Sequence, residues 1–459
     1  MKSKDRQTFH LRFRHMVDTL REEIHTGIYR HGDFLPAETR LMEQYNLGKH
    51  SVRSALEQLV KEGLIEKIDR VGSRVCYTAP AQVTLRFGVY SSLYEETNLK
   101  EIIAMFHQKY PHIKVEMIEL PYHQAESVRS LTQLGIFDVL TVNIFDFHYF
   151  KDHDGLALLE PQPMLPKTYP FLNHLFCADG SRLMLQPFVF SPVILCYNKD
   201  HLREQQLLEP DSTWTWEDLH QLLRQLKGVN RRGLFFHLSS VNRWPIFLIQ
   251  QGVKFTRGAT GPVMTEREDG FAILRMLRDL IHEEGMFPVG IGKYGEEDLF
   301  LQEKVSVILT TYFKLNRLKH ASFTYDIAQL PRGKTNATLL LSIGIAIYSN
   351  SPQKEAARLL SDFLTSEEIQ AYIRRTTFSL PANKWIAETL ETEQGNKPRR
   401  GELYREIVPF CATHDQLGLS MGEILIMGGC LKQYFSNLID EEELLEMFSA
   451  EVSREHMTR

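Results

Sequence analysis

The sequence has 459 residues, of which 43% are hydrophobic and 24% charged, an ordinary globular composition with room for two to four domains. No run approaches the roughly 18 apolar residues of a membrane span, which excludes a transmembrane protein and a membrane partner. The net charge of −5 is unevenly spread, because the first 79 residues carry 14 Lys and Arg against 11 Asp and Glu. A mildly basic head on an acidic remainder fits a local nucleic-acid contact.

The cysteines and the first residues bear on the compartment. The cysteines are scattered and form no CxxC pair; they are Cys76, Cys177, Cys196, Cys411 and Cys430. This pattern predicts buried free thiols in a reducing environment. The first 20 residues contain neither an apolar core of signal-peptide length nor a small-residue cleavage site, so we expect a cytoplasmic protein.

The head, residues 1–79, is predicted to contain three helices and a β-hairpin. The first helix spans residues 7–26, the second 38–45, and the third follows a turn within residues 46–64. After it, the stretch IEKIDRVGSRVCY at residues 65–77 predicts two short strands around a turn at Gly72.

The third helix has two contrasting faces. Its apolar stripe consists of Val52, Ala55, Leu56, Leu59 and Val60, and its opposite face carries Lys49, His50, Arg53, Ser54, Gln58 and Lys61. A helix that buries one face and offers cations and hydrogen-bonding groups at its N-terminal end is suited to reading the major groove of DNA. By itself, the same pattern also fits an ordinary solvated helix.

The residues around this helix decide between the two interpretations. Ile24, Gly27, Tyr29, Gly32 and the run LPAE at residues 35–38 follow the order I-x-x-G-x-[YF]-x-x-G-x-x-LP-[SA]-E. The later stretch, LGKHSVRSALEQLVKEGL at residues 47–64, follows V-[ST]-R-x-T-V-R-x-A-L-x-x-L-x-x-E-G-L. The segment therefore resembles the DNA-binding domain of the GntR family of bacterial repressors, which implies a winged helix-turn-helix fold.

The resemblance implies a set of DNA contacts. They are Glu38, Arg40, Lys49, His50, Ser51 and Arg53 around the reading helix, with Arg70, Gly72, Ser73 and Arg74 in the wing. Three of these assignments have alternatives, since Arg53 clamps a phosphate or reads a base, Glu38 caps a helix or faces DNA, and Arg74 contacts DNA or pairs with Asp69.

The sequence also departs from the family pattern at three positions. Thr39 and Lys49 stand where the family has arginine, and Arg70 stands where it has the first wing glycine. A lysine lacks the two-pronged guanidinium fork of arginine, so base reading at Lys49 is expected to be softer and the operator to differ from familiar ones.

The body begins with alternating α and β patterns. Apolar alternation predicts strands near residues 85–89 and 113–117 with a helix between them, a βαβ unit that requires a parallel sheet. Residues 137–142 predict another buried strand, and further α/β alternation continues to residue 385. The tail after Gln394 is predicted to be mostly helical.

Several motifs appear in a fixed order within residues 84–390. They are KYP after the first helix, YNKD followed by TWTW, the YDIAQLP strand and the LTSEEIQ helix. As a set, they resemble the solute-binding proteins of sugar importers, the maltose-binding-like group. The implied fold class is α/β: an N-terminal winged helix-turn-helix plus a two-lobed, type II periplasmic-binding-protein-like domain, with ligand bound between the lobes.

The predicted domains follow from these resemblances. Residues 1–79 form the DNA-binding domain, 80–83 a linker and 84–459 the ligand-sensing domain. Within the latter, the first lobe is expected to comprise about residues 84–190 and 331–383, and the second about 192–325 and 385–459. The chain would cross between lobes near Ser191, return between Tyr325 and Pro331, and cross again near Lys384.

Cleft residues are carried over from where the family's loops point. They are Tyr94, Glu95, Asn143, Asp146, Phe190, Ser191, Asn242, Trp244, Tyr312 and Phe313, a mixture of flat aromatic and polar groups that suits a sugar. Alternatives stay open: Trp244 is a cleft or a core residue, and either Tyr312 or Phe313 faces the cleft. The stretch FDFHYFKDHDG is rich in Asp and His, but its spacing matches no ligand motif, so no metal is predicted.

These features predict a transcription regulator that is not an enzyme and needs no cofactor. It would bind double-stranded operator DNA as a homodimer and sense a small molecule, a sugar or oligosaccharide; repression is implied by the resemblance alone. Two alternatives are a GntR head on an enzyme-like body and a DNA-binding protein without a ligand.

Overall fold

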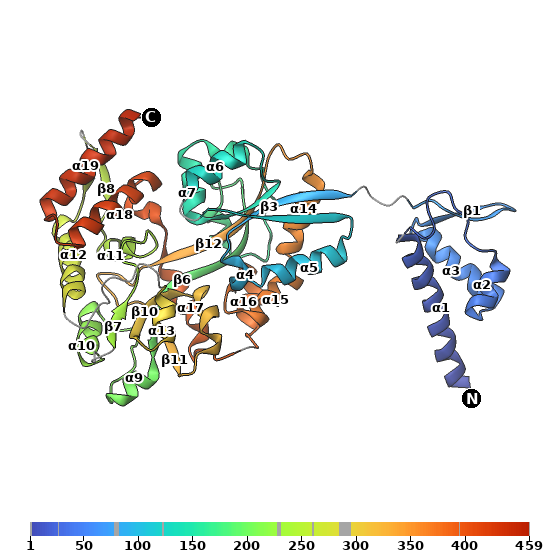
Figure 1. The fold of residues 1–459 in the computed structure, drawn as a ribbon, viewed down its shortest axis with the longest axis horizontal. Helices are drawn as coiled ribbons and strands as arrows, with labels where there is room; N and C mark the ends of the chain where they lie inside the picture. The colour runs from blue at the N-terminus through green and yellow to red at the C-terminus, as the bar shows by residue number, and fades with distance from the viewer. Residues whose placement is uncertain are drawn as a thin grey trace. The chain divides into compact units, whose positions relative to one another are not determined.

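The computed structural model describes residues 2–25, 27–77, 82–121, 124–226, 231–258, 261–283, 295–393 and 395–458. The chain folds as two compact units, Met1–Val83 and Thr84–Arg459, which we call the head and the body. Both are visible in Figure 1, and each is described by itself. Parts of the predicted linker, residues 80 and 81, and the predicted helix end at Thr26 lie outside the described residues.

The head contains a short helical core and a hairpin. Its elements are α1 (Lys2–His25), α2 (Glu38–Tyr45), α3 (Lys49–Lys61), β1 (Ile65–Ile68) and β2 (Gly72–Val75). β1 and β2 pair antiparallel as a wing. The arrangement is the predicted winged helix-turn-helix, with a first helix that begins five residues earlier than the apolar pattern indicated.

The apolar stripe of α3 is buried against α1 and α2. Val52, Ala55, Leu56 and Leu59 are all 2% exposed or less, and they pack in one cluster with the apolar face of α1. Val60 is an exception, with 36% of its surface exposed. At 100° per residue it lies about 80° from Val52 around the helix, at the edge of the stripe.

The body is built on one continuous mixed sheet with strand order β4-β3-β5-β12-β6-β10-β7. Its strands are β3 (Val83–Val89), β4 (Ile113–Glu119), β5 (Val139–Asn143), β6 (Gln186–Asn198), β7 (Arg232–Phe235), β10 (Val305–Thr311), β11 (Tyr325–Ala328), β12 (Thr338–Ile347), β13 (Leu380–Pro381) and β14 (Cys411–Ala412). A separate hairpin is formed by β8 (Phe255–Gly258) and β9 (Gly261–Met264). The predicted parallel sheet is present in the pairings of β3 with β5 and of β7 with β10.

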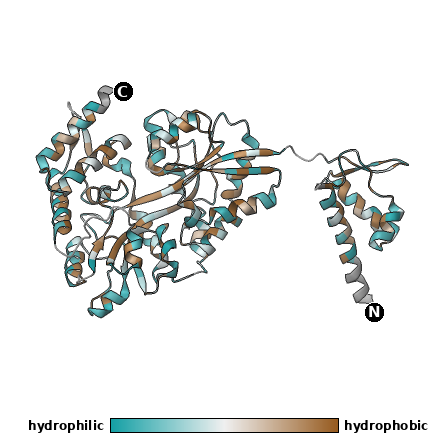
Figure 2. Cartoon of the chain, viewed as in Figure 1, coloured by the Kyte–Doolittle hydropathy of each residue, from teal (hydrophilic) through white to brown (hydrophobic). Residues whose placement is uncertain are grey.

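Helices flank the sheet in two groups (Figure 1). One group, the first lobe, contains α4 (Leu93–Glu96), α5 (Leu99–Lys109), α6 (Ala125–Gln133), α7 (Ile144–Asp152), α8 (Pro170–Leu175), α14 (Lys354–Leu364), α15 (Glu367–Thr376) and α16 (Lys384–Thr389). The other, the second lobe, contains α9 (Lys199–Glu204), α10 (Trp216–Leu226), α11 (Trp244–Gln250), α12 (Arg267–His282), α13 (Glu296–Leu301), α17 (Tyr404–Ile407), α18 (Met421–Phe435) and α19 (Glu441–Thr458). Figure 2 shows hydrophobic residues along the central strands and hydrophilic ones on the outer helices.

The two long strands, β6 and β12, are shared by both lobes. The first half of β6 pairs with β12 and β13, and its second half pairs with β10 and β11. The chain returns to the first lobe along β12. The predicted return between Tyr325 and Pro331 falls earlier than this crossing, because β11 pairs with the second half of β6 and Arg332 bonds to Trp214.

Two smaller predictions concern thiols and membranes. All five cysteines lie in described parts of the chain and are free, but only Cys177, Cys196 and Cys430 are buried, while Cys76 and Cys411 are half-buried. None of the described helices is both long and apolar enough to cross a membrane.

The separate core of the head generates a testable prediction. Leu59→Ala, which removes a side chain with 0% exposure, should lower the free energy of unfolding of the head by about 2–5 kcal/mol. Amide exchange measured by mass spectrometry should then accelerate about 100-fold in α1 and α3 peptides and stay unchanged in the body. Val60→Ala, at the neighbouring exposed position, is the control with little effect; equal acceleration by both variants would contradict this assignment of the core.

Candidate functional sites in the head and the body

The reading helix of the head presents a cationic surface. Arg40, Lys49, His50 and Arg53 are exposed, and Ser51 is half-buried at the start of α3. The left-handed residue Asn46 ends α2 and extended Gly48 precedes α3, so the second helix begins immediately after the turn. The structure therefore brings the predicted helix contacts together on one end of α3.

Glu38 and Arg53 form an ion pair between α2 and α3. The Nε group of Arg53 donates to both carboxylate oxygens of Glu38, at 2.9 and 3.1 Å. No described residue bonds to either Nη group of Arg53, whose side chain is 51% exposed. Glu38 thus holds the guanidinium by one edge and leaves its outer edge available.

In the wing, only part of the predicted set of DNA contacts is exposed and free of ion-pair partners among the described residues. Arg74 pairs with Glu66 across the hairpin, with Nε 2.9 Å from the carboxylate, and not with Asp69. Ser73 is 9% exposed, so its side chain has little surface to offer. Arg70 and Gly72 are exposed at the tip with φ of 62° and 148°. An arginine at this left-handed position costs about 1–2 kcal/mol more backbone energy than glycine, the residue of the family pattern.

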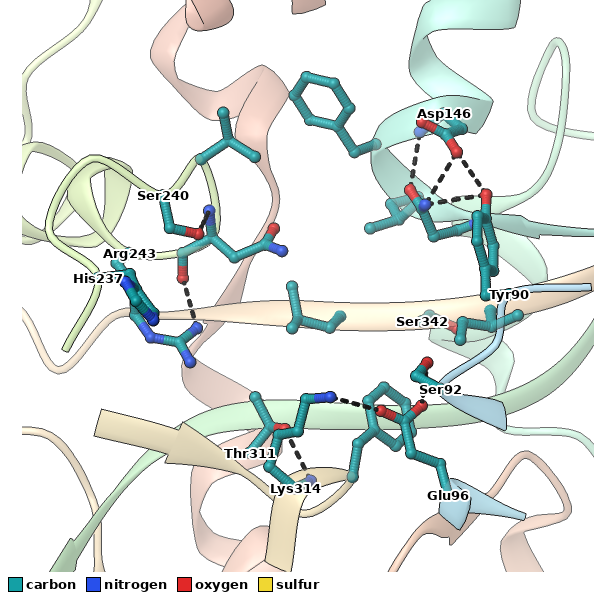
Figure 3. A pocket seen from close by; sticks show the side chains of 18 of the residues that line it. Tyr90, Ser92, Glu96, Asp146, His237, Ser240, Arg243, Thr311, Lys314 and Ser342 are labelled. Atoms are coloured by element: carbon teal, nitrogen blue, oxygen red, sulfur yellow. Dashed lines mark hydrogen bonds and ion pairs between the residues drawn. The ribbon is translucent and has the colours of Figure 1, made fainter. Parts of the chain in front are cut away.

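A cavity of about 590 Å³ lies between the two lobes of the body (Figure 3). Its first-lobe wall comes from the segments that follow β3 and β5, residues 90–96 and 143–146. Its second-lobe wall comes from residues 237–243, which lead into α11, and from Thr311, Phe313 and Lys314, at the end of β10 and just after it. Residues 341–343 of β12 form the floor. Most of these segments follow the carboxyl ends of strands, the usual place for a ligand in an open α/β sheet.

Asp146 sits in a hydrogen-bonded group on the first-lobe wall. The Nδ2 group of Asn143 lies 2.9 Å from both the Tyr90 hydroxyl and Oδ2 of Asp146, and Tyr90 donates its hydroxyl proton to the same oxygen. The Oδ1 atom of Asn143 caps α7 by accepting from the Asp146 amide at 2.8 Å. Burial raises the pKa of Asp146 to about 6, and the bonds from Tyr90 and Asn143 oppose that rise only in part.

The second-lobe wall is held by Arg243 and Lys314. Arg243 is 7% exposed and donates to the carbonyls of Asn242 and Leu309 at 3.1 and 3.3 Å. Its Nε atom is buried without a partner among the described residues. Lys314 reaches across to Glu96 of the first lobe at 3.3 Å.

The structure brings half of the sequence-predicted cleft residues to this cavity. Those that line it are Glu95, Asn143, Asp146, Asn242 and Phe313. Sequence reasoning missed lining residues that include Tyr90, Ser92, Glu96, His237, Arg243, Thr311, Lys314 and Ser342. For Tyr90, Ser92 and Glu96 the available signal was their place after the strand predicted near residues 85–89.

The other five predicted cleft residues lie elsewhere. Trp244 is fully buried in the second-lobe core, and Phe190 packs edge-on against Tyr169. Ser191 is buried and accepts the amide of Tyr312 at 2.7 Å. Tyr94 is not part of the lining and packs beneath the ammonium group of Lys100, which lies 4.9 Å from the ring centroid.

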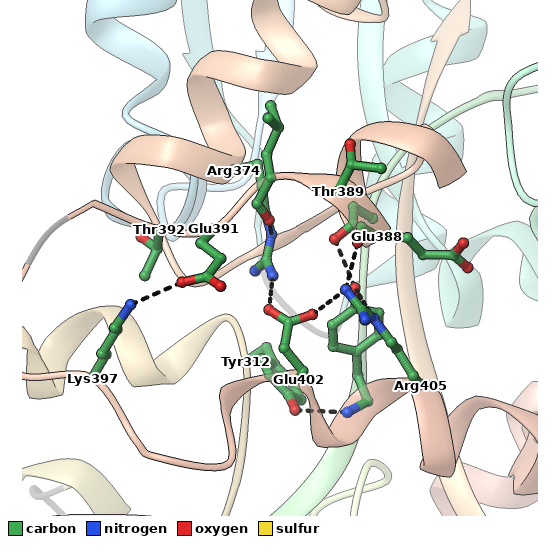
Figure 4. A network of polar contacts seen from close by, with 12 residues as sticks. Tyr312, Arg374, Glu388, Thr389, Glu391, Thr392, Lys397, Glu402 and Arg405 are labelled. Carbon is green, nitrogen blue, oxygen red and sulfur yellow. Dashed lines mark hydrogen bonds and ion pairs between the residues drawn. The ribbon is translucent and has the colours of Figure 1, made fainter.

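Tyr312 faces a separate polar network (Figure 4). Its hydroxyl accepts the backbone amide of Tyr404 at 2.9 Å. Beside it, Arg374 of α15 pairs with Glu402, which also pairs with Arg405 at 2.7 Å. This network ties α15 to the segment around α17. Of the two neighbouring aromatics, Phe313 therefore lines the cavity and Tyr312 does not.

The Asp- and His-rich stretch in α7 has structural partners. The ring of His153 stacks on Tyr149 at 4.0 Å, and Asp152 accepts the amide of Met421 at 3.1 Å. Within the described ranges, no group of three or more His, Cys, Asp and Glu side chains is arranged to hold a metal ion.

A winged helix with an exposed cationic helix, joined to a two-lobed body with a polar cavity, defines a regulator-type head on a binding-protein fold. Residues 13–75 match the gntR family of bacterial regulatory proteins, and residues 90–371 match the bacterial extracellular solute-binding proteins. The chain belongs to the bacterial extracellular solute-binding protein family, with a GntR-type helix-turn-helix domain at its head. Neither matched family is an enzyme family.

Individual relatives match one part or the other. The galactooligosaccharide-binding protein of Bacillus subtilis is 23% identical over 65% of this chain and 73% of its own. The repressor MngR of the mannosyl-D-glycerate transport/metabolism system in Escherichia coli is 36% identical over 14% of this chain and 26% of its own. The chain spans about half the length of the Brucella binding proteins that it matches at 25% identity. Maltose-bound MalE3 of T. maritima superposes with a TM-score of 0.68 at 19% identity, over 80% of this chain and 98% of that one, which shows the fold alone.

The raised pKa of Asp146 generates a prediction about pH. Because the folded-state pKa, about 6, exceeds the usual 3.8, the contribution of this group to stability is present at low pH and is lost as pH rises through 6. Asp146→Asn removes the ionisation, so its free energy of unfolding should exceed that of the parent by up to about 3 kcal/mol at pH 8 and by little near pH 4.

Urea denaturation of the full chain checks this expectation. The tryptophans, Trp214, Trp216, Trp244 and Trp385, all lie in the body, so their fluorescence reports that unit. Asp179→Asn is the control, and its free energy of unfolding should fall below that of the parent at high pH. Hydrogen bonds from Arg182 and Ser181 lower the pKa of Asp179, so its ionised form stabilises the fold. If the free energy of unfolding of Asp146→Asn exceeded that of the parent by the same amount at every pH, the raised pKa of Asp146 would be contradicted.

Proposed function

We propose that this chain is a cytoplasmic transcription regulator that binds operator DNA through its head and a carbohydrate through its cleft. The observation that carries the proposal is the presence of both matched families in one chain, and the exposed cationic helix of the head and the polar cavity of the body support it. A DNA-binding head acts where the DNA is, which supports an intracellular location. Two proteins similar to the body bind galactooligosaccharide or maltose, and a protein similar to the head is a repressor.

The head is proposed to place the N-terminal end of α3 in the major groove. Lys49, His50 and Ser51 would meet base edges, while Arg53, held by Glu38, would meet a base edge or a phosphate. The wing tip at Arg70 and Arg74 would follow the backbone or minor groove. A homodimer on a pseudo-palindromic operator would place half-sites about 34 Å apart, or a multiple of that distance.

The cleft is proposed to transmit the signal by changing how its lobes close. A ligand shifts a conformational equilibrium only through its different affinity for the two states. A ~100-fold change in operator affinity therefore requires about 2.7 kcal/mol of coupling. The lobes share β6 and β12, so closure bends or twists these two strands.

The DNA half of the proposal is tested by fluorescence anisotropy on DNA from upstream of the protein's own gene. Arg53→Ala should weaken binding by at least ~1 kcal/mol, about fivefold, at fixed salt. Lys61→Ala removes the same charge from the last turn of the same helix and is the matched control. Equal losses in both variants would mean that only overall charge matters and would remove Arg53 from the contact set.

The ligand half is tested in the same assay with a panel of mono- and oligosaccharides. One sugar should change the operator affinity, and Asn242→Ala should abolish that response while DNA binding is retained, because the Asn242 side chain lines the cavity. Gln225→Ala, which removes an exposed amide from α10, should leave the response intact. A full response in an Asn242→Ala, Phe313→Ala double variant would exclude this cavity as the site.

A further inference from the structure

The charges around the cavity do not balance. Its lining contains the carboxylates of Glu95, Glu96, Asp146 and Glu296 and the permanent cations of Arg243 and Lys314. Each cation already has a carboxylate, since Lys314 lies 3.3 Å from Glu96 and Arg243 lies 3.6 Å from Glu296.

Two first-lobe carboxylates remain without a cation from the described part of the protein, Asp146 and Glu95. Glu95 is exposed at the rim, whereas Asp146 is 1% exposed and lies inside the wall. Removing a carboxylate from water without a cationic partner is costly, and for Asp146 the cost appears as the raised pKa.

The hydrogen bonds around Asp146 use the donors of this cluster within the cluster itself. Asn143 directs its Nδ2 group at Tyr90 and Asp146, and Tyr90 directs its hydroxyl proton at Asp146. The two bonds that Asp146 accepts from these side chains both reach Oδ2, and none of the described side chains donates to Oδ1. The N–H and O–H groups of this cluster are therefore directed inward, so that it offers acceptors to the cavity and requires a ligand that donates.

We propose that the ligand of this cleft is a polyhydroxylated amine, an amino sugar or a sugar derivative with a protonated amino group, whose cation lies against Asp146. The proposal rests on the function proposed above and specifies the ligand class. An ammonium group supplies both missing features at once, three hydrogen-bond donors and a positive charge.

Neutral and anionic ligands match the cavity less well. A neutral hydroxyl donates to Asp146 but leaves its charge without a counter-charge in a buried site. An anionic substituent would have to displace Glu96 from Lys314 or Glu296 from Arg243 before it met a cation.

The test uses matched triplets of sugars that differ only in the substituent at C2 of each ring. Glucose, glucosamine and N-acetylglucosamine form one triplet, the galactose and mannose series form two more, and cellobiose, chitobiose and N,N′-diacetylchitobiose extend the set to disaccharides. Calorimetry on the full chain at pH 7 measures each affinity. In at least one triplet the amine should bind at least tenfold more tightly than both neutral members, and raising the salt from 50 to 500 mM should reduce that preference.

Two variants test whether the preference for the amine depends on the carboxylates of the first-lobe wall. Asp146→Asn should remove the tenfold preference, and Glu95→Gln should reduce it by a smaller factor because Glu95 is solvent-exposed. Asp179→Asn, an equal charge change elsewhere on the body, is the control. Intrinsic tryptophan fluorescence verifies that each variant is folded.

The possible results distinguish a failure of the amine assignment from a failure of the proposed carbohydrate sensing. Neutral sugars that bind as well as their amines in every triplet, or a preference that persists in Asp146→Asn, overturn the amine assignment and leave carbohydrate sensing in place. If no sugar of either kind binds, carbohydrate sensing fails and the inference fails with it.

Discussion

The antiparallel pairing of β6 with β12 is the constraint on which the rest of the body depends. The two strands run through both lobes, and Leu340, Leu341 and Ser342 of β12 face Pro192, Ser191 and Phe190 of β6 where they cross. The register shifts between Ile343 and Gly344, the irregularity expected where a strand bends. At Gly344 a Cβ atom would come within 2.8 Å of Leu185, so glycine permits this close approach. The floor of the cavity, residues 341–343, lies on the same stretch, which links the geometry of the hinge to the geometry of the site.

The cavity wall is built from side chains that a stable core would avoid. Asp146 and Arg243 are nearly buried and line the cavity, and the Nε atom of Arg243 has no hydrogen-bond partner among the described residues. Burying such groups costs free energy unless a partner satisfies them. The apolar clusters behind both walls, which include Trp244 in the second lobe, offset that cost and keep the polar groups in place. In the proposed function, a ligand would supply the bonds that the protein itself leaves incomplete.

Sequence patterns predicted the fold well because they report periodicity and backbone demands. The α2 span of residues 38–45 follows from Pro36 and from the apolar spacing of Leu41 and Tyr45, and the wing follows from the turn at Gly72. The cleft was predicted less completely. Aromatic residues were favoured as sugar contacts, and Trp244, Tyr312 and Phe190 turned out to fill cores, since large flat side chains serve packing equally well.

The polar lining residues could not be selected from sequence alone because their roles depend on partners distant in the chain. Lys314 forms an ion pair with Glu96, which lies more than 200 residues earlier in the chain. Glu38 likewise forms an ion pair with Arg53 on another helix. Strand order placed Tyr90 and Asn143 beside each other, although they are 53 residues apart. Only the position of a residue after a predicted strand carried information, and that signal selects a segment and not a side chain.

Linkage constrains how two such sites can work in one chain. If a ligand in the cleft changes operator affinity by some factor, operator DNA must change ligand affinity by the same factor. The head has an apolar core of its own, and the cavity is lined by residues of the body alone. In the proposed function, coupling between them would reside in a conformational equilibrium of the body, and the strands common to both lobes would be the elements whose two arrangements a ligand distinguishes. A ligand that contacted only one wall would stabilise open and closed lobes alike, so an effective ligand must contact both walls. The ion pair between Lys314 and Glu96 already joins the two walls, and such a ligand would compete with it.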